Sequence, residues 1–104
     1  MEIFTENFND LTPAETERLS LLAEEAGEVV QAIGKILRHG YESFNPNDPS
    51  KIVNRQTLER ELGDMAAAIH LMTTSRDLNG VYIKQCQREK LEKVAQYLHH
   101  QEAA

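Results

Sequence analysis

The sequence has little of several residue types, and each shortage excludes a class of protein. It contains one cysteine, Cys86, so no disulfide can form within the chain, and a reducing compartment is favoured over secretion. Three prolines and five glycines are too few for a chain made mostly of loops. No apolar run approaches the ~20 residues that span a bilayer. The segment Met1 to Asp10 also lacks the basic and apolar regions of a signal peptide. We therefore expect a cytoplasmic protein that does not associate with membranes.

Basic residues are scarce as well. Lysine and arginine number 11 against 17 acidic residues, which gives a formal charge of −6. This balance disfavours binding to a nucleic-acid polymer, which needs clustered cations. A length of 104 residues suits one domain, residues 1–104, with a core small enough that self-association is expected.

Strong helix signals fill most of the chain. Thr12, Pro13 and Glu15 form a helix start, with a cap, a proline at the first position and a capping box. Apolar residues then recur every three or four positions up to a stop signal at Gly40, which predicts a helix of about seven turns. These residues are Leu19, Leu22, Ala26, Val29, Ile33, Ile36 and Leu37.

Two further helices are predicted after a long loop. Residues 41–54 hold two prolines and three asparagines, and this connection is either functional or a simple linker. A second helix begins near Asn54 or Thr57 and fades at 76–80, and a third runs from Val81 to Tyr97 or beyond. The expected inner positions of the third helix are Val81, Leu91, Val94 and Leu98. A short piece before Leu11 is the only other candidate element, so the fold class is all-α.

The first two predicted helices repeat one pattern at a constant offset of 36 residues. Leu22, Glu25, Gly27 and Glu28 are matched by Leu58, Glu61, Gly63 and Asp64, and the match continues through Ala32-Ile33 and Ala68-Ile69. Residues three apart on a helix are neighbours. Each helix therefore carries an acidic pair at the same margin of its own apolar stripe, and packing of the stripes predicts that the pairs converge.

Converging carboxylates repel one another unless they are protonated or hold a cation. Oxygen ligands without Cys or His favour Mg²⁺, with Mn²⁺ as a substitute. Gly27 and Gly63 each cost ~1 kcal/mol in a helix relative to alanine, and close approach of the two backbones is a reason to accept that cost. The alternative is that both acidic pairs are ordinary solvated surfaces.

The motif Glu24-Glu25-x-x-Glu28 followed by Glu61-x-x-Asp64 resembles the signature of MazG-like nucleoside triphosphate pyrophosphohydrolases. The resemblance covers roughly residues 12–95, and the gap before Glu61 is longer than is usual, with the extra length in the 41–54 loop. It implies an all-α helical bundle completed by dimerisation or tetramerisation. It also implies Mg²⁺-dependent hydrolysis of a (deoxy)nucleoside triphosphate to the monophosphate and pyrophosphate.

The resemblance assigns roles to particular residues. Glu25, Glu28, Glu61 and Asp64 would be metal ligands. Glu24, one turn from Glu28, is the candidate general base, although an exposed helix acid is an equal explanation. Lys35, Arg38 and Lys84 are candidate phosphate contacts or solvated cations. Tyr41 and Phe44 could stack on a base or anchor the loop.

Two other functions stay open. The chain could be a non-catalytic helical interaction module of the same fold, or a hydrolase of another phosphorylated nucleotide such as a guanine alarmone.

Overall fold

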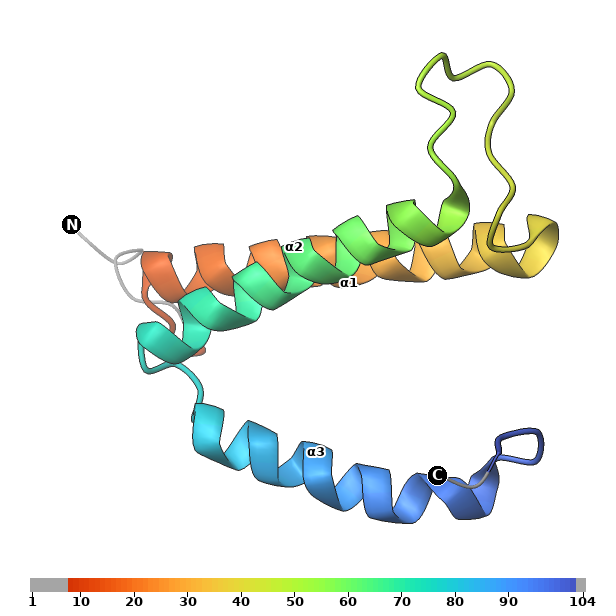
Figure 1. Cartoon of the computed structure of the whole chain (residues 1–104). Helices are drawn as coiled ribbons and strands as arrows, with labels where there is room; N and C mark the ends of the chain where they lie inside the picture. The colour runs from red at the N-terminus through yellow and green to blue at the C-terminus, as the bar shows by residue number, and fades with distance from the viewer. Residues whose placement is uncertain (1–7, 103–104) are drawn as a thin grey trace.

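The computed structural model describes residues 8–102, and this part of the chain is helical without strands. It comprises α1 (Pro13–His39), α2 (Asn54–Thr74), α3 (Gly80–Val94) and the 3₁₀ helix η1 (Ala95–Tyr97) (Figure 1). The predicted all-α class is confirmed, and the helix boundaries fall close to the predicted ones. The proposed piece before Leu11 lies largely outside the described residues. Within that range, every helix is too short or too polar to cross a bilayer.

The capping residues predicted from the sequence define both ends of α1. The Thr12 hydroxyl accepts a hydrogen bond from the Glu15 amide at 3.1 Å, and the Glu15 carboxylate accepts one from the Thr12 amide at 2.8 Å. At the other end Gly40 adopts φ +90°, a conformation that side chains disfavour, and its amide donates to the Ile36 carbonyl. α1 therefore begins and ends where its local chemistry dictates.

α1 and α2 form a long hairpin that contains the core (Figure 1). Among the described residues four apolar side chains are buried, two from each helix: Val29, Ala32, Ala68 and Met72. Other apolar residues of the two helices stay open to solvent, including Leu19, Ile33 and Leu62, each 42% exposed. The apolar faces of α1 and α2 are therefore only partly covered in a single chain.

The turn between α2 and α3 is fixed by an ion pair and a helix cap. Arg18 of α1 donates two hydrogen bonds to the Asp77 carboxylate, from Nε to Oδ2 at 2.6 Å and from Nη2 to Oδ1 at 3.0 Å. The Asn79 side chain accepts from the amides of Val81 and Tyr82, which starts α3. The end of α2 is thereby attached to the beginning of α1.

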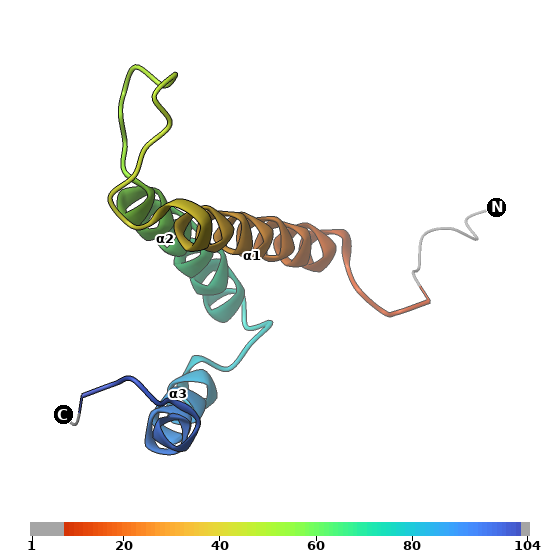
Figure 2. The ribbon, with the colours of Figure 1, turned by 90° about the vertical axis from the view of Figure 1, so that its right-hand side faces the viewer.

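α3 leaves the hairpin and packs against neither of the other helices (Figures 1 and 2). The prediction that Val81, Leu91, Val94 and Leu98 are inner positions is wrong for three of these residues in the single chain. Val81 is 77% exposed, Leu91 65% and Leu98 45%, whereas Val94 is half-buried, and no residue of α3 is buried. The apolar spacing predicts the helix correctly, but the described part of the chain leaves most of this face uncovered.

The overall shape is extended. The radius of gyration is 18.5 Å, whereas a compact domain of this length has about 13 Å. The principal extents are 57, 41 and 21 Å. The four acidic residues of the predicted metal site all lie on the hairpin of α1 and α2.

Candidate metal centre

Four carboxylates from α1 and α2 come together on the hairpin. One oxygen from each lies within 4.8 Å of the others, and the group consists of Glu25, Glu28, Glu61 and Asp64. The helices are antiparallel, so the first acid of each pair lies beside the second acid of the other pair. The charge of Asp64 acts on Glu25 more strongly than that of Glu61 does, and Glu28 is the main partner of Glu61.

Two of the four carboxylates are destabilised as ions. The pKa of Glu25 is raised, first by loss of solvent and then by the charge of Asp64. The pKa of Glu61 is raised, first by the hydrogen-bonding approach of Glu28 and then by loss of solvent, and the positive charge of Arg60 opposes this rise less strongly than these causes promote it. Oε2 of Glu25 and Oε2 of Glu61 are buried, and neither has a hydrogen-bond partner among the described residues. Both buried oxygens are therefore left without a partner from the described part of the chain.

These features fit a divalent metal ion. The donors are all carboxylate oxygens, which suit hard cations such as Mg²⁺ and Mn²⁺ better than Zn²⁺ or Cu²⁺. Two buried acceptors without partners are the atoms that a cation would satisfy. One oxygen of each carboxylate lies within 4.8 Å of the others, so the four groups are near enough for a cation to lie among them.

The expected role of the two glycines is wrong. A Cβ at Gly27 or at Gly63 would meet nothing within 4 Å, so these positions face open space in the single chain. The residues buried between the helices near the carboxylates are alanines of the same repeat, Ala32 at 4% and Ala68 at 1% exposed. Alanine allows close helix packing without the backbone cost of glycine, and it is alanine that occupies the seam.

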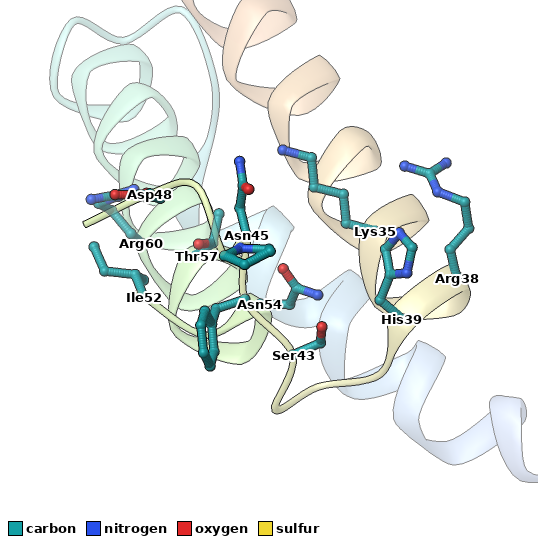
Figure 3. A pocket seen from close by; sticks show the side chains of 12 residues that line it. Lys35, Arg38, His39, Ser43, Asn45, Asp48, Ile52, Asn54, Thr57 and Arg60 are labelled. Atoms are coloured by element: carbon teal, nitrogen blue, oxygen red, sulfur yellow. The ribbon is translucent and has the colours of Figure 1, made fainter. Parts of the chain in front are cut away.

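A groove continues from the carboxylates toward the loop between α1 and α2. A small hollow of about 200 Å³ is lined by Glu28, Glu61, Lys35 and Thr57 together with Gln31 and Ala32. A larger pocket of about 480 Å³ shares Lys35 and Thr57 with it. Figure 3 shows Lys35, Arg38 and His39 on the α1 side of this pocket and Arg60 with Asp48 on the α2 side.

The other predicted site residues lie in three different situations. Lys35 lines both hollows and Arg38 lines the larger one. Glu24 is exposed beside Glu25 and is not one of the four converging carboxylates. Lys84 lies on α3 and lines neither hollow, so the single chain does not bring it to the site.

The loop aromatics have separate positions. Arg55 lies over the Tyr41 ring at 4.3 Å from its centroid, and the Arg55 amide donates to the Tyr41 carbonyl at 2.9 Å. Tyr41 therefore anchors the base of the loop, one of its two predicted alternatives. Phe44 lines the larger pocket and is 40% exposed.

Several residues at the groove had not been identified as site candidates from the sequence. Thr57 lies one turn before Glu61 and Arg60 one residue before it. Their closeness to the acidic pair in the sequence could have identified them as site candidates. Asn45 and Asn54 reach the pocket only because the loop folds back. No spacing rule predicts that folding.

One of the comparisons with known proteins identifies a family. The family model described as MazG nucleotide pyrophosphohydrolase domain matches residues 14–100, a range that includes α1 from its second residue, all of α2 and α3, and the four carboxylates. Neither curated proteins nor solved structures gave a match. The match covers most of the chain, and the chain therefore belongs to the MazG nucleotide pyrophosphohydrolase family.

Proposed function

We propose that this protein hydrolyses a (deoxy)nucleoside triphosphate to the monophosphate and pyrophosphate, with Mg²⁺ as cofactor and Mn²⁺ as a substitute. The observation that carries the proposal is the convergence of four carboxylate oxygens within 4.8 Å, two of them from residues with a buried oxygen that lacks a partner. Family membership supports the same class of reaction. A module that had lost the reaction would have little reason to keep four mutually repelling acids.

Glu25, Glu28, Glu61 and Asp64 are the proposed ligands. When bound, divalent ions neutralise phosphate charge and lower the pKa of water. The reaction adds water across the phosphoanhydride bond between the α- and β-phosphates. Glu24, exposed beside the cluster, is the proposed base that accepts a proton from this water. Lys35 and Arg38 are the proposed contacts to phosphate oxygens, because both line the adjoining groove.

We also propose that the protein acts as a homodimer or homotetramer in the cytoplasm. The extended shape and the uncovered apolar residues of α3 support self-association. In such an assembly Lys84 of one chain could reach the metal centre of a neighbouring chain, since it does not reach the centre of its own chain.

A nucleotide panel tests the activity. With Mg²⁺, at least one ribo- or deoxynucleoside triphosphate should release pyrophosphate and not orthophosphate, and Glu61→Ala should abolish turnover with the helical circular dichroism retained. Glu24→Gln should lower kcat without changing Mg²⁺ affinity, and an unchanged kcat would remove Glu24 from the mechanism. Including a hyperphosphorylated guanine nucleotide separates the alternative substrate class. If no nucleotide is cleaved with either Mg²⁺ or Mn²⁺, the proposed hydrolase activity is refuted.

A further inference from the structure

The larger pocket beneath the 41–53 loop has more positive charge than the protein around it. Three basic side chains, Lys35, Arg38 and Arg60, line it together with His39. The only carboxylate among its lining residues is Asp48. In a chain with a formal charge of −6, this concentration of cations is an exception.

Asp48 is already engaged within the loop. Its Oδ1 accepts hydrogen bonds from the Ser50 amide at 2.9 Å and from the Ser50 hydroxyl at 2.7 Å. These bonds lower the pKa of Asp48, so it remains an ion whose acceptor capacity is partly used by the loop itself. The described residues form no ion pair between Asp48 and any cation of the pocket. Among the described residues neither Arg38 nor Arg60 forms an ion pair, although the charge of Arg60 also acts on Glu61 in the adjoining hollow.

The loop that covers the pocket is held at its base. The Asn54 amide donates to the Ser43 carbonyl at 2.8 Å, and the Asn54 side chain donates to the Gly40 carbonyl at 3.1 Å. Arg55 bonds to Glu42 and lies over Tyr41. Further hydrogen bonds within residues 45–51 form turns. The pocket wall is thus built by its own bonds before a ligand arrives.

The pocket adjoins the carboxylate centre but is chemically opposite to it. Lys35 and Thr57 line both hollows, so the acidic end and the basic end lie next to each other. Its volume of about 480 Å³ lies in the usual range for small-molecule sites. Arginine presents a planar fork of donors that matches phosphate oxygens, and here Arg38 and Arg60 come from different helices.

We propose that this pocket is a phosphate-binding subsite that works without a metal ion. On the proposed function, it holds a phosphate group of the nucleotide beyond those at the carboxylate centre. Two sources have this chemistry. One is the pair of phosphates released as pyrophosphate, and the other is an additional phosphate on the sugar of the nucleotide.

Calorimetric titrations in EDTA test the subsite, with inorganic pyrophosphate, a nucleoside 3′,5′-bisphosphate and a nucleoside 5′-monophosphate as probes. We expect pyrophosphate or the bisphosphate to bind, and to bind at least about tenfold more weakly to the double variant Arg38→Ala/Arg60→Ala. Arg88→Ala, on α3 and away from the pocket, is the matched control and should bind like the wild type. Arg60→Lys, which keeps the charge but not the fork, should show an intermediate loss.

The probes separate the sources. Stronger binding of pyrophosphate identifies the leaving phosphates, and stronger binding of the bisphosphate identifies a sugar phosphate. Preference for the monophosphate over both, or equal binding to wild type and double variant, would overturn the subsite.

The outcome is independent of the proposed hydrolysis. Glu25→Gln, which should be inactive and whose side chain lines neither hollow, is expected to bind the same probe in EDTA within about twofold of the wild type, because the subsite needs no metal. If no nucleotide is cleaved but binding depends on Arg38 and Arg60, the hydrolase fails and the subsite stands. If cleavage occurs but the arginine variants bind the probes like the wild type, only the subsite fails.

Discussion

At the scale of single residues, the carboxylates control the behaviour of the hairpin. Glu25 and Glu61 have raised pKa values and one buried oxygen each without a partner, so their ionised forms oppose folding when no cation is present. Binding of a cation to the folded state reverses this effect, by ~2.7 kcal/mol when the ion is 100-fold above its dissociation constant. The same residues that weaken the metal-free protein are thus the ones expected to stabilise the loaded protein.

Replacing Glu61 by glutamine should therefore stabilise the metal-free protein. Because the pKa of Glu61 is raised in the folded state, its ionisation lowers stability as pH rises from about 4.5 through the higher folded value. The thermal midpoint of Glu61→Gln in EDTA should exceed that of the wild type at neutral pH, and the difference should shrink toward about pH 4.5. Added Mg²⁺ should raise the wild-type midpoint far more than that of the variant. A variant less stable than the wild type in EDTA at neutral pH would contradict this account of the cluster.

Gly27 offers a second prediction for a single residue. Since a Cβ there meets nothing within 4 Å, Gly27→Ala should stabilise the helix by about 1 kcal/mol, or roughly 4–8 °C in thermal midpoint. Gly40→Ala is the opposite case, because φ +90° strains any side chain, and it should destabilise. Thermal unfolding at one protein concentration measures both. A lower midpoint for Gly27→Ala would mean that another chain contacts this face.

At the scale of elements, the helices were predictable and their partners were not. Thr12, Pro13 and Glu15 determine where α1 begins through local bonds, and Gly40 determines where it ends, so sequence rules suffice there. The 36-residue repeat predicted that the acidic pairs meet, because each pair occupies the same position relative to the apolar stripe of its own helix. The role given to Gly27 was wrong, since spacing does not say which side of a helix a neighbour occupies. Arg60 and Asn45 were missed because the loop brings them together through nonlocal folding.

The ion pair between Arg18 and Asp77 should determine how firmly the end of α2 is attached to α1. Hydrogen bonds from Arg18 lower the pKa of Asp77, so the pair stabilises the fold above about pH 3.8 and the effect is lost as pH falls through the lower folded value. Asp77→Asn should therefore lower the thermal midpoint at neutral pH. Glu42→Gln, which breaks a far more exposed pair with Arg55, should change the midpoint little. Equal effects of the two variants would show that the Asp77 pair is not a structural tie.

At the scale of the whole molecule, many large apolar side chains of the single chain are exposed. Among the described residues four apolar side chains are buried, whereas Val30, Leu37, Val81 and Leu91 are each at least 65% exposed. The radius of gyration of 18.5 Å exceeds the value of about 13 Å for a compact domain of this length, so the single chain is not compact. A second copy that covers α3 and the open side of the hairpin would supply the missing core.

Leu91 tests that assembly. Sedimentation should give the wild type a mass of at least twice the 11.8 kDa of the chain. Leu91→Glu should reduce the mass or the thermal midpoint, because a charge placed in an apolar contact is costly. Gln85→Glu, which adds the same charge on a different side of the same helix, serves as the control. A wild type that sediments as a stable, helical 11.8 kDa species would contradict self-association.

The most direct test of the central claim is a calorimetric titration of Mg²⁺ into the purified protein and its carboxylate variants. Glu25→Gln and Asp64→Asn, one from each helix, should each weaken binding by about tenfold or more, because on the proposed function both acidic pairs hold the metal. Glu59→Gln, an exposed acid two residues before Glu61, should bind like the wild type. Absence of Mg²⁺ and Mn²⁺ binding, or equal affinity in all three variants, would contradict a metal centre built from the two acidic pairs.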